Sequence, residues 1–159
     1  MTLSLVPMPT SRLVPWMRRS TAEYEKSRVL AGETPEQAAE AARRSFGEAF
    51  PDGAPAEGHL VYDVIDDARP GQPVGILWIA PRVPGSSDWC VFDVEIDEAH
   101  RGAGLGRATM LLAEQAAARH GAETLGLNVF GYNQVARHLY ESLGYETTAV
   151  QMRKELRAP

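Results

Sequence analysis

The chain has 159 residues, of which 44% are hydrophobic and 23% are charged, and its formal net charge is -5 at pH 7. These values are typical of a globular protein, and we expect residues 1–159 to form a single domain. The acidic balance argues against a general nucleic-acid-binding protein, because such proteins are usually basic.

Cysteine content and hydropathy exclude further classes of protein. The one cysteine, Cys90, cannot form an intrachain disulfide or a cysteine metal cluster, so we expect no metal. No apolar run approaches the length of a membrane span, and the N-terminus lacks a basic region followed by an apolar core. We therefore expect a cytoplasmic protein without a membrane partner.

The first half of the chain predicts an edge strand, two helices and a pair of strands. The predicted elements are a strand over residues 3–8, helices over 10–31 and 34–50, and strands over 59–66 and 74–80. The second helix has the clearest start, because Thr34 and Gln37 have capping-box spacing and Pro35 occupies the first helical position.

The second half alternates strands and helices. It predicts a strand over residues 91–97, a helix over 105–120, a strand over 124–130, a helix over 132–143 and a final strand over 145–155. The whole order is β-α-α-β-β-β-α-β-α-β. A hairpin-rich half followed by a βαβ unit predicts an α/β fold with a mixed sheet and helices on both faces.

A glycine-rich turn joins the strand over residues 91–97 to the helix that follows it. It reads Arg101-Gly102-Ala103-Gly104-Leu105-Gly106. Glycines allow a tight turn and close approach of a ligand, and the first amides of the helix have no intrahelical partner. Together with the helix dipole, these amides favour an anion, above all phosphate. Arg101 and Arg107 add positive charge.

Spacing decides among the phosphate-binding loops. A Walker loop would need a lysine that this turn lacks, and a dinucleotide fingerprint would need glycine at Arg107 or Thr109. The pattern Arg-x-x-Gly-x-Gly does fit, through Arg101, Gly104 and Gly106. It resembles motif A of the GCN5-related N-acetyltransferases, the GNAT superfamily. A nucleotide-binding module that shares only the glycine-rich turn is a rival reading.

A second motif lies near the C-terminus. Asn133 followed by Ala-x-x-Leu-Tyr-x-x-Leu-Gly-Tyr over residues 136–145 resembles GNAT motif B. The element order resembles the GNAT fold over nearly the whole chain, in a bacterial subgroup with a long two-helix N-terminal region. The resemblance implies splayed central strands, with acetyl-CoA as the acyl donor lying between them.

The resemblance also implies which residues contact the donor. They are Val94, Ile96, Arg101, Gly102, Ala103, Gly104, Leu105, Gly106, Arg107 and Asn133. Asn133 also suits a simple helix cap, and the two uses can coexist.

Two side chains are candidate catalytic groups. Tyr140 matches the motif B tyrosine, and a phenol near the sulfur can protonate the leaving thiolate. Periodicity alone would make it a core residue, because it shares a helical stripe with Ala136, Leu139 and Leu143. Glu95 is the candidate base, with Asp93 and Asp97 on the same side of the strand and Phe92, Val94 and Ile96 opposite. A solvated acidic face is the alternative.

The expected function is acetyl transfer from acetyl-CoA to a primary amine by direct attack in a ternary complex. We expect a cationic acceptor, because the acidic stripe at residues 93–97 would attract an ammonium group. The alternative is a GNAT-fold sensor or scaffold that binds acyl-CoA without turnover. The acceptor's identity and the choice between monomer and homodimer stay open.

Overall fold

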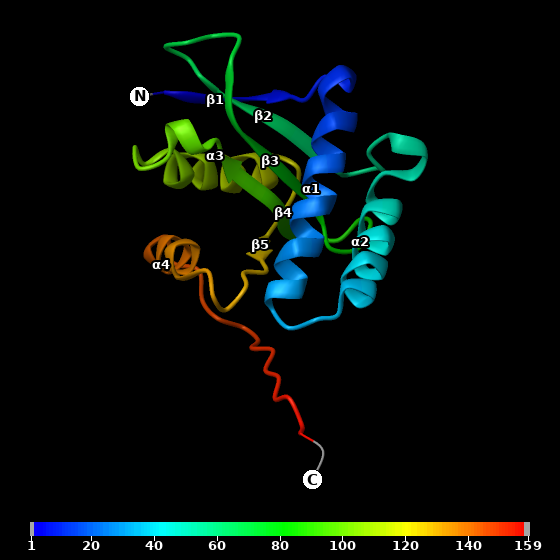
Figure 1. The fold of residues 1–159 in the computed structure, drawn as a ribbon. Helices are drawn as coiled ribbons and strands as arrows, with labels where there is room; N and C mark the ends of the chain where they lie inside the picture. Colours follow the sequence, from blue (N-terminus) through cyan, green and yellow to red (C-terminus); the bar gives the residue numbers. More distant parts are fainter. Residues whose placement is uncertain (1, 158–159) are drawn as a thin grey trace.

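A five-stranded mixed sheet separates two layers of helices in the structure, a computed structural model that describes residues 2–157 (Figure 1). The strands are β1 (Leu3–Pro7), β2 (Leu60–Asp66), β3 (Pro73–Pro81), β4 (Asp88–Ile96) and β5 (Thr124–Leu127). The helices are α1 (Thr10–Leu30), α2 (Pro35–Ala49), α3 (Leu105–Arg119) and α4 (Gln134–Ser142), with short 3₁₀ turns η1 (Pro51–Gly53) and η2 (Glu98–His100). The predicted α/β class and mixed sheet are confirmed.

The strands follow one another in chain order across the sheet. Strands β1 to β4 pair antiparallel, and β5 pairs parallel to β4 after the α3 crossover. A parallel connection needs such a crossover, whereas antiparallel neighbours need only short turns. The C-terminal end of β4, where the chain enters α3, is therefore the place where the sheet can open.

Each face of the sheet has its own apolar core. On one face, α1 and α2 pack an aromatic cluster, built around Trp16, Phe46, Phe50 and Trp78, against β2 and β3. On the other face, α3 buries Met110 and Ala113 against the sheet residues Leu77 and Ile79. The alternation of side chains along β3 supplies both cores, because Leu77 and Trp78 point to opposite faces.

Helix α2 starts as the sequence predicts. The Thr34 hydroxyl accepts a hydrogen bond from the Gln37 amide at 3.2 Å, and the Gln37 side chain accepts one from the Thr34 amide at 3.0 Å. This capping box satisfies two of the amides that a helix start leaves without partners. It fixes the turn that sends α2 back along α1.

The predicted final strand over residues 145–155 is wrong. Within residues 2–157, the sheet ends at β5, and the chain beyond Leu143 has no regular secondary structure. The segment leaves the sheet, and Arg153 donates a hydrogen bond to the carbonyl of Gly32 at the end of α1. Alternating residues favour a strand, but a strand forms only where a neighbouring edge is paired.

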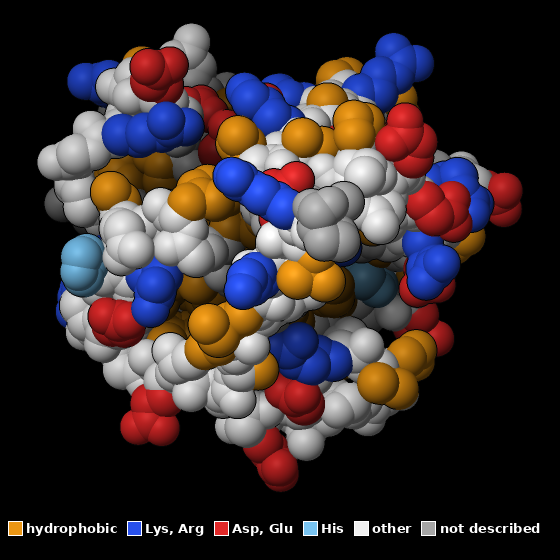
Figure 2. All heavy atoms as spheres, turned by 60° about the horizontal axis from the view of Figure 1, so that its bottom comes forward, with side chains coloured by type: hydrophobic (Ala, Val, Ile, Leu, Met, Phe, Trp, Pro, Cys, Tyr) orange, Lys and Arg blue, Asp and Glu red, His pale blue; other side chains and the backbone are white. Residues whose placement is uncertain are grey.

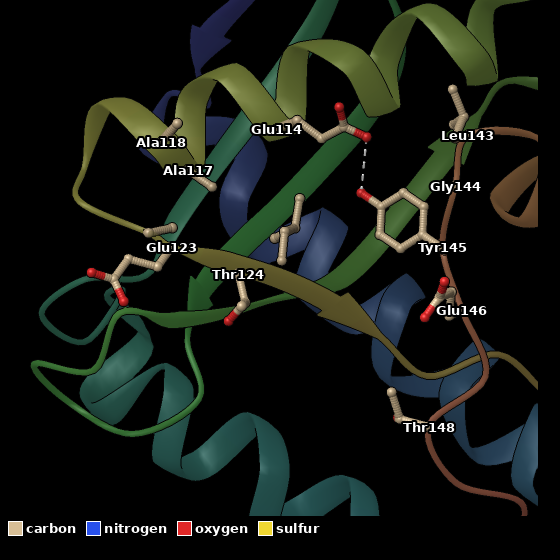
Figure 3. A pocket seen from close by; sticks show the side chains of 12 residues that line it. Glu114, Ala117, Ala118, Glu123, Thr124, Leu143, Gly144, Tyr145, Glu146 and Thr148 are labelled. Carbon is tan, nitrogen blue, oxygen red and sulfur yellow. Dashed lines mark hydrogen bonds between the residues drawn. The ribbon is translucent and has the colours of Figure 1, made fainter.

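A cavity of about 520 Å³ lies beside the outer part of β5 (Figure 3). Its walls come from α3, β5 and the segment Leu143–Thr148, and the Tyr145 hydroxyl donates a hydrogen bond to Glu114 at its edge, at 3.2 Å. Its lining includes no residue of β4 or of the glycine turn. The cavity is therefore separate from the glycine turn.

Among the described residues, no helix has both the length and the apolarity to cross a bilayer.

An ion pair attaches the start of α1 to the sheet. Arg12 Nη1 lies 2.8 Å from Asp63 Oδ2, and the Asp63 side chain is only 6% exposed. Burial raises the pKa of Asp63, and the positive charge of Arg12 partly offsets that effect. The pair thus neutralises a carboxylate under α1 and fixes where the helix crosses β2.

We predict that Arg12→Met lowers the free energy of unfolding by about 3 kcal/mol at neutral pH, because it leaves Asp63 buried without its counter-charge. Below the raised pKa of Asp63 the carboxyl is neutral, so the loss should shrink in acid and grow as the pH rises. Urea unfolding at about pH 4.5 and pH 7 measures both values. Arg12→Met together with Asp63→Leu should recover most of the stability. An equal loss at both pH values would contradict this account.

Candidate active site

A β-bulge at Phe92 opens the sheet between β4 and β5. Trp78 pairs with Asp93, whereas the next residue of β3, Ile79, pairs with Val91, so β4 has one extra residue. Pairing of β4 with β5 ends at Val91 and Leu127. The second half of β4 therefore has a strand on one side only, and the splayed central strands expected from the sequence are present.

The open edge of β4 presents backbone groups of alternate residues. The Asp97 amide donates to the Val74 carbonyl of β3 at 2.9 Å, so the backbone groups of Asp97 and Glu95 face β3. Those of Val94 and Ile96 must then face the gap. The Ile96 carbonyl accepts a hydrogen bond from Arg101 Nε at 2.8 Å, which agrees with this orientation. Val94 and Ile96 can therefore bond an extended chain lying in the gap.

The glycine turn leaves room for an anion at the start of α3. Gly102 and Gly104 have φ of 82° and 77°, and a Cβ at either position would meet no atom within 4 Å. Gly104 is the N-cap, and the first helical bond runs from Ala108 to Gly104. The amides of residues 105–107 precede that bond and have no intrahelical acceptor. The turn therefore fits a phosphate group that approaches the backbone closely.

The two arginines of the turn have different surroundings. Arg101 is 58% exposed and lies 3.9 Å from Glu95, besides its bond to Ile96. Arg107 donates to the Ser142 hydroxyl of α4 at 2.8 Å. Arg101 thus lies between the open edge of β4 and the turn, while Arg107 ties α3 to α4.

Helix α4 carries the two predicted motif B residues. The Asn133 side chain accepts a hydrogen bond from the Ala136 amide at 3.2 Å, so its role as a helix cap is confirmed. Tyr140 is half-buried and packs edge-on against Tyr145. Burial and then the negative charge of Asp93 raise the pKa of Tyr140, so its phenol stays protonated at neutral pH.

The bulge changes which side chains share a face. We expected Phe92 opposite Asp93, but this expectation is wrong, because Phe92 stacks on Trp78 on the α1 side, with ring centroids 4.8 Å apart. Asp93 lies on the same side, where the Ser20 hydroxyl of α1 donates to its Oδ2 at 2.8 Å. An extra residue breaks the two-residue period of a strand, so consecutive side chains can point the same way.

The two carboxylates of β4 differ in environment. The Glu95 side chain is 42% exposed and faces Arg101 at 3.9 Å. Burial, opposed by the Ser20 hydrogen bond and reinforced by the charge of Glu95, raises the pKa of Asp93 to about 6. No local pattern points to Ser20, because 73 residues separate it from Asp93. Within residues 2–157, no three side chains of His, Cys, Asp or Glu gather as a metal site.

Comparisons with known proteins agree with this geometry. The sequence profile of the acetyltransferase (GNAT) family matches residues 17–145. The chain is 32% identical to YycN of Bacillus subtilis, described as an uncharacterised N-acetyltransferase, over 98% of this chain and all of that protein. The crystal structure of YycN superposes with a TM-score of 0.88 at 30% identity, over 99% of this chain and 100% of that one.

A more distant structure shares the fold. The PaiA N-acetyltransferase of Thermoplasma acidophilum, solved in complex with coenzyme A, is 11% identical, with a TM-score of 0.63 over 95% of this chain and 94% of its own. The fold, the glycine turn, the open β4 edge and the family profile lead to one conclusion. This chain is an enzyme of the GNAT acetyltransferase family.

Proposed function

We propose that this protein transfers an acetyl group from acetyl-CoA to a cationic primary amine, by direct attack within a ternary complex. The observation that carries the proposal is the bulged strand β4, whose unpaired half leads into a glycine turn at the start of α3. The first part suits an extended arm with amide groups, and the second suits phosphate. Acetyl-CoA contains both groups in that order. The PaiA structure from the same fold contains coenzyme A.

The donor-binding residues divide by the chemistry they offer. In the proposal, the amides of Leu105, Gly106 and Arg107 bind the pyrophosphate, while Gly102, Ala103 and Gly104 let it approach the backbone. Arg101 and Arg107 contribute positive charge, and the backbone of Val94 and Ile96 bonds the pantetheine arm. Asn133 caps α4 and contacts the donor beside it.

Tyr140 is the proposed acid. The amine nitrogen forms the new C–N bond, the C–S bond breaks, and the leaving thiolate receives a proton from the Tyr140 hydroxyl. A phenol whose pKa is raised holds its proton at neutral pH, and it still stabilises the developing thiolate by a hydrogen bond. The nitrogen must lose a proton to a carboxylate, for which the sequence predicts Glu95.

Local charge, rather than a charged surface, supports a cationic acceptor. Figure 2 shows basic, acidic and hydrophobic side chains intermingled over one face, with no continuous field of one sign. Asp93 and Glu95, in contrast, lie together on the α1 side of β4, near enough for the charge of Glu95 to raise the pKa of Asp93. Two carboxylates attract an ammonium group, and the attraction should weaken in salt.

Turnover separates this enzyme from a sensor that only binds acyl-CoA. The purified protein should release free thiol from acetyl-CoA in the presence of polyamines, lysine-type amines or amino sugars. Calorimetry should show binding of CoA but not of NAD or ATP. Binding of CoA with no thiol release from any amine would favour the sensor.

We predict that Gly104→Val lowers CoA affinity at least about tenfold, because a side chain would block the approach of phosphate to the turn. Gly85→Val is the matched control, since Gly85 has a φ of 79° and, like Gly104, no atom within 4 Å of an added Cβ. Both variants carry the same backbone strain, but only Gly104 lies in the turn. Calorimetry measures the CoA affinity of both folded variants. Equal affinities would contradict the proposal that the glycine turn binds the phosphates of CoA.

We predict that Tyr140→Phe lowers turnover by about ten- to a thousandfold, which is the usual range for one lost acid or hydrogen bond. The ring and its packing against Tyr145 remain, so the unfolding midpoint and the CoA affinity should stay close to the wild-type values. Steady-state thiol release with the best amine measures the loss. Unchanged turnover would make Tyr140 a packing residue.

A further inference from the structure

Asp93 is placed by the bulge and not by the regular pleat of β4. Phe92 and Asp93 both point to the α1 side, because the Phe92 ring stacks on Trp78 and the Asp93 carboxylate bonds to Ser20 of α1. The open edge of β4 begins at the same place, because pairing with β5 ends at Val91. Asp93 therefore lies where the gap opens, close enough to α4 for its negative charge to raise the pKa of Tyr140.

Ser20 connects this carboxylate to α1. Its hydroxyl donates to Asp93 Oδ2 at 2.8 Å, and both residues are half-buried. Helix α1 contacts two strands of the sheet through polar side chains. Arg12 forms an ion pair with Asp63 on β2, and Ser20 forms a hydrogen bond with Asp93 on β4. The helix is thus anchored to two strands of the sheet, and the second anchor holds Asp93 through Oδ2. A hydrogen bond from the Val94 amide also lowers the pKa of this carboxyl.

We propose that Ser20 is a positioning residue that holds Asp93 as the carboxylate receiving the amine proton, in place of Glu95. The inference rests on the proposed acetyl transfer. The ammonium acceptor gives one proton to Asp93, and its nitrogen then attacks the thioester. Tyr140 gives its proton to sulfur as the C–S bond breaks, and the second proton of the nitrogen passes through solvent to the Tyr140 phenolate and restores the phenol. Asp93 finally releases its proton to solvent, so protons balance over the cycle.

The surroundings of the two carboxylates favour Asp93 for this step. A base works best when its pKa lies near the working pH, and burial raises the pKa of Asp93 to about 6. Besides burial, the groups that act on the pKa of Asp93 are Ser20 and Arg19 on α1, and Glu95 and the Val94 amide on β4. The charge of Asp93 in turn raises the pKa of Tyr140 on α4. Glu95 is more exposed and faces Arg101, which suits attraction of the acceptor better than proton transfer.

The test combines direct titration with pH–rate profiles. Because the Ser20 hydrogen bond lowers the pKa of Asp93, Ser20→Ala should raise it by up to about one unit, as one neutral hydrogen bond allows. Carboxyl ¹³C NMR of the free protein reads this shift without any substrate. The acidic limb of kcat/KM should move to higher pH by the same amount, because only the ionised carboxylate accepts a proton.

Control variants separate a positioning role from a structural one. Ser27→Ala makes the same change at another half-buried serine of α1 and should leave the titration and the profile in place. Ser20→Thr keeps the hydroxyl, so the acidic limb of its kcat/KM profile should lie at the wild-type pH. Asp93→Asn should lower turnover at least about a hundredfold and abolish the acidic limb, with CoA affinity retained. Glu95→Gln should raise the acceptor KM and leave the limb where it is.

The opposite pattern would overturn the inference. If Glu95→Gln removes the acidic limb and Asp93→Asn keeps it, Glu95 is the base. If Ser20→Ala matches Ser27→Ala in both readouts, Ser20 does not position Asp93. Absence of turnover with every amine would instead overturn the proposed acetyl transfer, and with it the proton step. The NMR titration would still decide whether Ser20 controls Asp93.

Discussion

One extra residue in β4, Phe92, is the constraint on which the site depends. Along the rest of the strand, β4 pairs with β3 on one edge and β5 on the other, but beyond the bulge it keeps only β3. The same residue breaks the alternation of side chains, so Phe92 and Asp93 both face α1. A regular strand would have sent them to opposite faces and left no unpaired edge.

Three elements that are distant in sequence meet at this opening. The start of α3 brings free amides, α4 brings a protonated phenol, and α1 brings the serine that bonds Asp93. Each is tied to the scaffold by a specific contact: Arg107 joins α3 to α4, and Arg12 joins α1 to β2. The site is therefore assembled by contacts that rigid elements make with one another, and the proposed chemistry uses groups that these contacts place.

Features that depend on neighbouring residues could be predicted from the sequence, whereas features that depend on contacts between distant residues could not. The capping box of α2, the Asn133 cap and the glycine turn depend on neighbouring residues, so the sequence alone was sufficient for them. The bulge could not be predicted in this way, because the alternation of polar and apolar residues over 91–97 does not show whether the strand contains an extra residue. The final strand was predicted from alternation, but pairing with an edge decides whether a strand forms. The Ser20–Asp93 bond depends on the tertiary fold.

Hydrogen exchange with and without CoA tests the central claim most directly, namely that the open edge of β4 and the glycine turn form one donor site. In the free protein, the amide of Ile96 should exchange much faster than that of Asp97, which bonds to β3. CoA should protect Ile96 and residues 105–107, and NAD or ATP should not. Protection by CoA elsewhere, with Ile96 still exchanging freely, would contradict the account.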